Sequence, residues 1–383
     1  MFGNTWLYKG LIHMCDIIQI RRELHQIPEV GMDLPKTLKY IINHLEGLKN
    51  IDYKVIEGKA VVAKTKHHKN NRFLAFRSDM DALPVEELND ISYKSIHPGI
   101  MHACGHDAHM AILLCFAEYI NSLEDPEIGV MFIFQPGEEG NAGAKWLIDH
   151  GIFKEYVPER IFALHMFPSL RTGVVASRPG PLFIGTEEFH LKLHGTGGHA
   201  GFPENSIDLI EIFVNIFSDS RREAIKIANG DKYIFFFGKT ITNGRNNVFP
   251  SILNTEGTIR AYDNTLMKAL ENNLLKYCKL YANNNFELSF STPYLPVVND
   301  SDSFSIIKKA SADNKILLKE IEPLRIGEDF SYYLSKTRGA MFLLGCAGNG
   351  IFNRKLHSQN FEIDESSLKI GLNLFITIYD LCI

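Results

Sequence analysis

Residues 129–140 read GVMFIFQPGEEG, an apolar run that leads into a turn carrying two acidic residues. The run from Gly129 to Phe134 has no polar face, which is typical of a strand covered on both sides in a parallel sheet. Open α/β sheets bind their ligands in the crevice outside the carboxyl ends of the strands. The stretch therefore predicts an α/β fold and indicates which edge of the sheet would carry a site.

Helix and strand patterns alternate through the rest of the first half of the chain. Apolar residues recur at helical spacing in Cys15–Ile27, Leu34–Leu48 and Met110–Ile120. Short apolar runs predict strands at Tyr53–Ile56, Ala60–Lys64, Phe73–Arg77 and Phe162–His165. This order predicts an α/β layer fold with a mostly parallel sheet.

The pattern changes at Gly185 and changes back after Pro293. Glu187–His194 (EEFHLKLH) alternates apolar and polar residues, as a half-exposed antiparallel strand does. A β-α-β-β-α-β order follows, which matches a ferredoxin-like arrangement, with helices at Ser206–Ile227 and Thr265–Ala282 and strands at Tyr233–Thr240, Leu253–Arg260 and Glu287–Thr292. The α/β pattern then resumes with Ser303–Ala312, Ala340–Cys346 and Glu365–Leu381. We expect a larger α/β domain built from residues 1–182 and 293–383, with an inserted α+β domain at residues 183–292.

Composition and charge exclude several classes of protein. The 40 Lys+Arg and 45 Asp+Glu residues give a net charge of −5 without a basic block, so we expect no nucleic-acid partner. No apolar run reaches the ~18 residues that span a bilayer, and the N-terminus lacks a signal-peptide pattern. We therefore expect no membrane contact and a cytoplasmic location. The scattered cysteines do not resemble a disulfide scaffold, and five are interpreted as buried small apolar residues: Cys15, Cys115, Cys278, Cys346 and Cys382.

The sixth cysteine lies in the segment HACGHDAH, residues 102–109, which holds three histidines and an aspartate within eight residues. Imidazole nitrogen and thiolate sulfur bind zinc, cobalt or nickel, and Cys104 and His106 could project from one side of a loop. One alternative is a polar loop in which Asp107 caps the following helix. Another is a Cys/His nucleophilic pair, although residues two apart rarely face each other in the required way.

Further candidate groups follow other predicted strands. Glu138 and Glu139 come directly after the apolar run, and adjacent side chains diverge, so one can bind a metal while the other acts as a base. Asp79 lies in RSDMDALP, which also ends a strand. His165 ends the strand 162–165, and His357 follows a glycine-rich loop. Each of these, taken alone, would more often be a solvated acidic turn or a structural histidine.

In combination, these motifs resemble a known family. MHACGHDAH is highly specific to the metal-dependent amidohydrolases that include hippurate hydrolase, auxin-conjugate hydrolase and N-acetyldiaminopimelate deacetylase, relatives of aminoacylase and the dinuclear carboxypeptidases. RSDMDALP, FQPGEEG and GGHAGFP occur in the expected order, and the resemblance extends from Arg22 to Ser358.

The resemblance implies a site with two divalent metal ions, whether Zn, Mn, Co or Ni. The family pattern places metal ligands, with Cys104 bridging both ions, at Cys104, His106, Glu139, His165 and His357. Glu138 would be the general base, and Asp79 would orient a metal-site residue. His199, from the inserted domain, would polarise the scissile carbonyl, in some relatives from a partner subunit; the alternative is a turn histidine. The inserted domain would serve as lid and dimerisation domain of a homodimer.

The expected substrate is a small N-acyl amino acid. Three stretches look most like N-acetyldiaminopimelate deacetylases of lysine biosynthesis: 185–188, 256–260 and 341–345. Alternatives are a hippurate hydrolase, a general aminoacylase or carboxypeptidase-like peptidase, and a non-catalytic N-acyl amino acid or peptide binder. Asn247 and Arg260 are candidates for contacting a substrate carboxylate, and a solvated loop with a surface ion pair is the alternative. The loop at 242–250 and the stretch GNGIFNRK (348–355) depart from the common family form.

Overall fold

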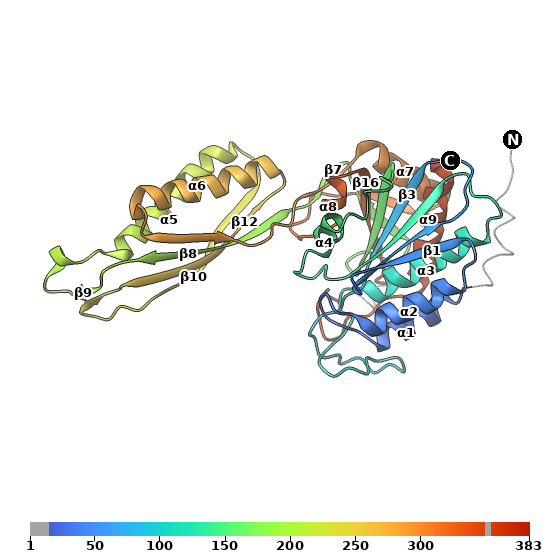
Figure 1. Ribbon diagram of the computed structural model, residues 1–383, viewed down its shortest axis with the longest axis horizontal. Coiled ribbons are helices and arrows are strands. Elements are labelled where there is room, and N and C mark those ends of the chain that lie inside the picture. Colours follow the sequence, from blue (N-terminus) through green and yellow to red (C-terminus); the bar gives the residue numbers. More distant parts are fainter. Residues whose placement is uncertain (1–14, 349–353) are drawn as a thin grey trace. The chain divides into compact units, whose positions relative to one another are not determined.

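The computed structural model describes residues 15–348 and 354–383 (Figure 1). They form two compact units. Unit 1 comprises the chain up to Leu182, Val298–Glu322 and Asp329 to the C-terminal residue, and unit 2 comprises Phe183–Val297 and Pro323–Glu328. Residues 1–14, where no signal peptide is expected, and most of the irregular stretch before His357 lie outside the described residues.

Unit 1 contains an eight-stranded sheet in the order β1-β2-β4-β3-β5-β16-β6-β15. Its strands are β1 Ile51–Ile56, β2 Ala60–Thr65, β3 Phe73–Asp79, β4 Gly129–Gln135, β5 Arg160–Phe167, β6 Val174–Ser177, β15 Leu317–Glu320 and β16 Arg338–Gly345. The four central strands run parallel, from β4 through β3 and β5 to β16, while β1 and β2 pair antiparallel at one edge. The prediction of a mostly parallel α/β sheet is confirmed.

Helices cover both faces of this sheet. The longer ones pack together against one face, and they are α1 Ile17–Gln26, α2 Pro35–Glu46, α3 His106–Ser122, α7 Ser301–Asp313 and α9 Ser366–Cys382. The short α4 (Gly143–Asp149) and α8 (Ser331–Leu334) contact each other, β4 and β16. Within the described ranges, no helix is long and apolar enough to cross a membrane.

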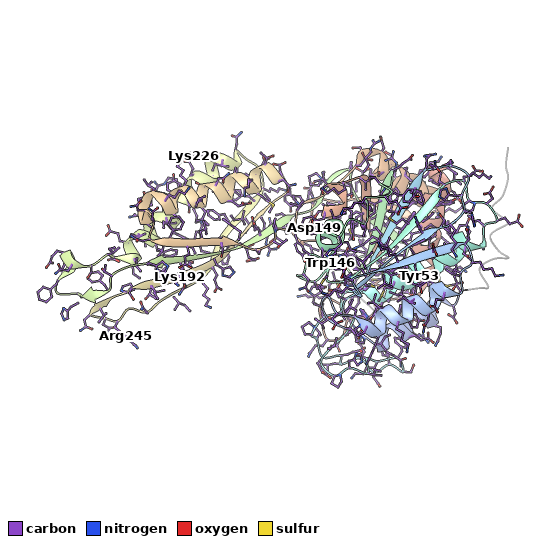
Figure 2. The ribbon with its side chains drawn as sticks, viewed as in Figure 1. Tyr53, Trp146, Asp149, Lys192, Lys226 and Arg245 are labelled. Atoms are coloured by element: carbon purple, nitrogen blue, oxygen red, sulfur yellow. A yellow bond between two sulfur atoms is a disulfide. The ribbon has the colours of Figure 1, made fainter. Side chains whose placement is uncertain are left out.

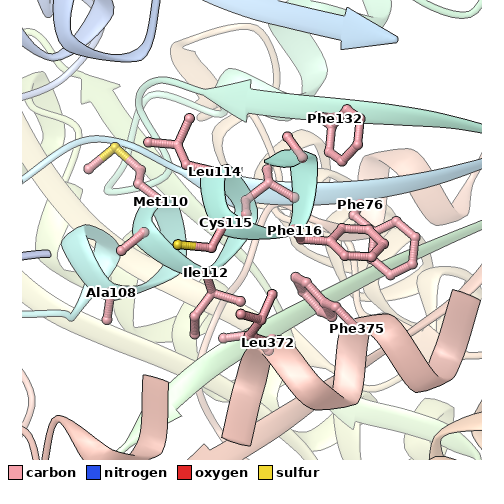
Figure 3. Close-up of a cluster of buried hydrophobic side chains, with 14 of the residues drawn as sticks. Phe76, Ala108, Met110, Ile112, Leu114, Cys115, Phe116, Phe132, Leu372 and Phe375 are labelled. Atoms are coloured by element: carbon pink, nitrogen blue, oxygen red, sulfur yellow. The ribbon is translucent and has the colours of Figure 1, made fainter. Parts of the chain in front are cut away.

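The core of unit 1 is centred on α3, which is apolar on nearly all sides because it lies between the sheet and other helices. Phe116 of α3 meets Phe76 of β3 and Phe375 of α9 at ring-centroid distances of 4.6 and 5.8 Å (Figure 3). All three rings are buried, and each contributes about 1.5–3 kcal/mol through the burial of its apolar surface. This packing fixes the helix whose first residue is His106.

Unit 2 has its own sheet and its own core. The sheet order β10-β12-β8-β13 is fully antiparallel, and two long helices supply the other layer. In chain order the elements are β8 Gly185–His194, β9 Gly198–His199, α5 Leu209–Ala228, β10 Tyr233–Thr242, β11 Val248–Phe249, β12 Ile252–Ala261, α6 Asn264–Ala282 and β13 Phe286–Phe290. This is the predicted β-α-β-β-α-β order. Lys226 on the helix α5 and Lys192 on the strand β8 point to opposite sides of the unit (Figure 2).

Some elements had no usable signal in the sequence. Sequence patterns did not predict the short elements α4, α8, β6, β7 (Gly180–Phe183), β14 (Val297–Asn299) and β15. They have three to seven residues each, too few to display a period. His165 was expected to end its strand, but β5 continues for two more residues to Phe167.

One cysteine prediction is wrong. Cys15 and Cys115 form a disulfide across a sequence separation of 100 residues, with Cα atoms 5.7 Å apart. The pairing arises because α1 packs against α3, which a search for regular cysteine spacing cannot detect. Cys278 and Cys346 are buried and unpaired, as expected, while Cys382 is only partly buried.

The core of unit 2 contains one acidic residue on the buried side of β8. Glu187 is 5% exposed and shares this side of the strand with Phe189 and Leu191. Burial, together with the neighbouring carboxylate of Glu271 on α6, raises the pKa of Glu187 to about 8. Glu271 is paired with Lys268, one turn earlier in the same helix. The folded protein therefore holds a proton here that the unfolded chain releases.

We expect Glu187→Gln to flatten the pH dependence of stability. The folded-state pKa is about 8 and the ordinary value is 4.5, so the free energy of unfolding of the wild type should fall as pH rises through this window. The amide cannot ionise and removes this slope. Urea unfolding at several pH values between about 5 and 8 measures it. Glu188→Gln, on the exposed side of β8, is the matched control; equal slopes for wild type and Glu187→Gln would contradict the assignment.

Candidate metal centre

The predicted site residues of unit 1 converge at the carboxyl ends of the parallel strands. Asp79 is the last residue of β3, Glu138 and Glu139 follow β4, and His165 lies near the end of β5. Strands β4 and β5 lie on opposite sides of β3, so the chain changes direction across the sheet at this point. Such a switch point opens a crevice between the loops, which is where α/β folds bind ligands.

Two groups of potential ligand atoms share Cys104. In one group the thiol lies with His106 and His165, and in the other it lies with Glu139 and His357. Within each group the atoms are all within 4.8 Å of one another. The five residues predicted as ligands are thus brought together, although they come from four separate segments of unit 1.

Hydrogen bonds fix the orientation of two of the imidazoles. Nδ1 of His106 lies 2.7 Å from the backbone carbonyl of Asp81, and Nδ1 of His165 lies 2.7 Å from the carbonyl of Met166. A carbonyl only accepts, so each Nδ1 carries a hydrogen, and Nε2 is the nitrogen of each ring that remains to bind a metal. Nε2 of His165 is 3.4 Å from Sγ of Cys104. Both rings therefore direct Nε2 to the centre, the arrangement found in metal-binding histidines.

His109 has the opposite arrangement and serves as a support. Its Nε2 accepts the backbone N–H of Met166 at 2.9 Å, and its Nδ1 donates to Asp79 at 2.6 Å. Neither nitrogen is left for a metal. His109 instead joins the end of β5 to Asp79, a role that the histidine count of the motif did not reveal.

The centre is strongly negative and has an unsatisfied nitrogen atom. Among the described residues, Nε2 of His106 is buried without a hydrogen bond, and Oε1 of Glu139 is buried with the imidazole of His357 as its neighbour. Burial opposes protonation of His106, but Asp79, Asp81 and Glu139 outweigh it and raise its pKa to about 10. Burial and the same surplus of carboxylates raise the pKa of the Cys104 thiol. A thiolate beside these acids requires compensating positive charge, so the donor set fits divalent cations.

His357 has an unusual backbone conformation. Its φ angle is 63°, in the left-handed region, which costs a non-glycine residue about 1–3 kcal/mol. The backbone N–H of His357 donates to the carbonyl of Ala103 at 2.8 Å, directly beside Cys104. Its Nε2 lies 3.2 Å from Oε1 of Glu139. The strained conformation therefore brings this ring to the centre from the far end of the chain.

Asp81 was not singled out from the sequence, although it lies in the same RSDMDALP stretch as Asp79. Its two carboxylate oxygens accept the backbone N–H groups of Glu138 and Glu139, each at 3.0 Å. Its carbonyl accepts from His106. One buried residue thus aligns the acidic pair and a histidine. The preceding strand and the paired acidic residues in that stretch could have indicated it.

A buried arginine, Arg77, forms an ion pair with Asp79 and fixes its position. Arg77 donates to Asp79 at 2.7 Å, to Asp329 at 3.0 Å and to Gln135 at 2.9 Å. Burial opposes ionisation of Asp79, but Arg77 and the two histidines His106 and His109 hold its pKa well below the ordinary value. Asp79 is therefore a fixed negative charge, whose Oδ2 lies 3.6 Å from Nε2 of His106.

The remaining candidates lie in unit 2. His199 and Asn247 are neighbours at one end of this unit, where β9 pairs with β11 and Ala200 donates to the carbonyl of Asn247; Arg245 marks this end in Figure 2. The backbone N–H of Gly201 donates to Nδ1 of His199 at 2.9 Å, which leaves the hydrogen on Nε2.

Arg260 is not brought together with these two residues. It pairs with Thr186 at the opposite end of β12 from Ile252, which pairs with His194. Its Nε lies 3.4 Å from Oγ1 of Thr258. Within one copy of unit 2, a single carboxylate therefore cannot contact both Asn247 and Arg260.

Comparison with known proteins places this geometry in a family. The profile of Peptidase family M20/M25/M40 matches residues 75–380. Proteins named N-acetyldiaminopimelate deacetylase from Lactobacillus helveticus and Exiguobacterium sibiricum are each 34% identical to this chain, covering 94% and 93% of it and 95% and 96% of their own lengths. A Bacillus subtilis structure, described as a dinuclear metal binding peptidase from M20 family, is 27% identical with a TM-score of 0.80 and covers 96% of this chain and 97% of its own.

We expect Asp81→Asn to lower the affinity of the centre for divalent cations while leaving the fold intact. The amide can present only one acceptor to the two N–H groups, and its NH₂ would face the other. Residues that orient metal ligands typically change metal affinity or activity by about 10–100-fold. Titration with Zn²⁺ in a chelator competition would measure the loss, with circular dichroism to check the fold. Wild-type affinity in this variant would contradict the role of Asp81.

Proposed function

Because the chain belongs to Peptidase family M20/M25/M40, we propose that it is a metal-dependent hydrolase that cleaves the amide of an N-acyl amino acid. The observation that carries the proposal is the pair of ligand groups that share Cys104. A lone zinc site would need only one such group. A shared sulfur between two groups fits two divalent cations, as in the Bacillus subtilis relative described as dinuclear.

The ligand assignment follows from the donor atoms. Cys104, His106 and His165 would hold one cation, and Cys104, Glu139 and His357 the other. When bound, the cations would lower the pKa of a water molecule and polarise the substrate carbonyl. The mixed sulfur, nitrogen and oxygen donors suit Zn, Mn, Co or Ni.

Glu138 is our candidate for the base. It is buried, with Oε2 4.0 Å from Nε2 of His106, while its neighbour Glu139 points to His357. We assign to Glu138 the removal of a proton from the attacking water and its later delivery to the leaving amine. Asp79, fixed by Arg77, would hold His106 and His109 in place.

His199 is proposed to stabilise the oxyanion. The hydrogen bond at its Nδ1 leaves Nε2 as the donor, the form that an oxyanion requires. Because His199 belongs to unit 2, that unit would act as a lid over the centre. Asn247, beside His199, remains our candidate for a substrate contact, and Arg260 would need a different substrate group or another subunit.

The proposed substrate is N-acetyldiaminopimelate, which would place the enzyme in lysine biosynthesis. Support comes from relatives of that name, which are 33–34% identical to this chain over 95–96% of their own lengths. A hippurate hydrolase, general aminoacylase or carboxypeptidase-like peptidase remains the second candidate, since the same centre would serve it. The intact Glu138 and ligand set argue against a protein that binds N-acyl amino acids or peptides without turnover.

We further propose a homodimer formed through unit 2. Strand β10 is an edge strand of its sheet, and Phe236 and Ile241 on it are 56% and 53% exposed. Val214 on α5 is 50% exposed. An apolar edge strand of this kind pairs readily with another chain. We also propose a cytoplasmic location without nucleic-acid or membrane partners, and the net charge of −5 agrees with the absence of a nucleic-acid partner.

The adjacent glutamates provide a matched pair of variants. We expect Glu138→Gln to retain bound metal and to lose turnover, because the base is removed and the ligands stay. Glu139→Gln should lose metal as well, because a ligand is removed. Metal analysis after gel filtration, together with acetate release, measures both effects. Near-normal kcat in Glu138→Gln would exclude Glu138 as the base.

Substrate choice is tested by comparing three amides on one preparation: N-acetyldiaminopimelate, hippurate and N-acetylmethionine. The first carries a free amino-acid head, and a site built to pair such a group rejects analogues that lack it. We expect the highest kcat/KM for N-acetyldiaminopimelate. A preference for hippurate of about tenfold or more would replace the deacetylase assignment and leave the metal mechanism intact.

A further inference from the structure

A buried ion network lies on the other side of the helix start that carries His106. Arg21 and His25 lie one turn apart on α1, and both meet the same oxygen of Asp107. Nε of Arg21 and Nδ1 of His25 are each 2.7 Å from Oδ2 of Asp107. All three side chains are 0% exposed. Asp107 immediately follows His106, so two donors from α1 fix the backbone beside a proposed ligand.

The same two residues extend the network to other segments. Nε2 of His25 lies 3.2 Å from Oε1 of Glu87, whose other oxygen accepts the N–H of Ser95 at 2.8 Å. Nη2 of Arg21 lies 2.8 Å from Oε1 of Glu362. The network therefore joins α1 and the start of α3 to the loop around Glu87 and to the segment that enters α9.

The segment around Glu362 also follows His357, the ligand from the far end of the chain. Asn89 donates to the carbonyl of Phe361 at 2.8 Å and to Glu87 at 3.2 Å. His357 itself donates to Ala103. The segments that carry His106 and His357 are thus attached to a single set of buried charges.

Energetics favour a positional role for this network. Removing a charged group from water costs several kcal/mol, and buried ion pairs are often no more stabilising than apolar residues of the same volume. Arg21, His25 and three acids in one buried cluster are therefore poorly explained by stability alone. What such a network provides is a fixed geometry, because each partner tolerates only one arrangement.

We propose that Arg21 and His25 are positioning residues of the metal centre. Through Asp107 and Glu362 they hold the segments of His106 and His357 in the spacing that two cations require. The inference rests on the proposed function, and it assigns a part of that function to residues of α1 that touch neither metal nor substrate.

Metal affinity and stability, measured separately, test this role. The variants are His25→Gln and Asp107→Asn, which remove charge at nearly constant volume, and the probes are Zn²⁺ and Mn²⁺ alone in chelator competition. We expect both variants to bind these cations about 10–100-fold more weakly at a temperature well below their unfolding midpoints. Arg21→Lys, which keeps the charge but loses the guanidinium fork, should give an intermediate loss.

Asp300→Asn is the matched control. Asp300 pairs with Arg160 at 2.9 Å and caps α7 in the same unit, away from the ligand segments. It should lower the unfolding temperature and leave cation affinity unchanged. If Asp107→Asn does not fold, His25→Gln decides the matter alone.

Wild-type cation affinity in His25→Gln would overturn the positioning role, and so would a loss that Asp300→Asn reproduces at equal destabilisation. The proposed function would stand in both cases, because the wild type would still bind metal and hydrolyse its amide. A wild-type protein that binds no divalent cation would overturn both proposals.

Discussion

The carboxylate of Asp81 is the contact on which the centre depends. Strands β3 and β4 are parallel neighbours in register, with Asp79 opposite Gln135, so the loops after both strands leave the sheet side by side. Asp81 in one loop accepts the N–H groups of Glu138 and Glu139 in the other. Hydrogen bonds to a buried charge are worth about 1.5–3 kcal/mol each. The adjacent glutamates are therefore oriented before any ligand arrives, one toward His357 and the other toward His106.

The second constraint is charge. Asp79, Asp81, Glu138 and Glu139 lie within one buried region, and His106 and His165 are oriented by hydrogen bonds at Nδ1 so that Nε2 faces it. Such a region is unfavourable unless cations occupy it, because buried like charges repel one another. The same arrangement that destabilises the bare site would therefore supply affinity for divalent metals. Arg77 offsets part of the charge through its buried ion pairs with Asp79 and Asp329.

Local sequence patterns were sufficient for the fold class. The apolar run 129–134 and its neighbours predicted a parallel sheet because hydrophobic periodicity is a property of a few consecutive residues. The β-α-β-β-α-β order of unit 2 was predicted for the same reason. The residues of HACGHDAH and the two glutamates could also be selected as candidates, since ligand chemistry is a property of the side chain and the motif is compact. His165 and His357 were selected by position after predicted strands and by the family resemblance.

Tertiary structure decided what each residue does. Asp79 and Asp81 look equivalent in the sequence, yet one is held by Arg77 and the other aligns the glutamates. His109 resembles His106 but uses both nitrogens for support. Arg21 binds Asp107 across a sequence separation of 86 residues, and Cys15 pairs with Cys115 across 100. No local pattern encodes such pairs, because they are created when helices and strands pack, and packing depends on the whole core at once.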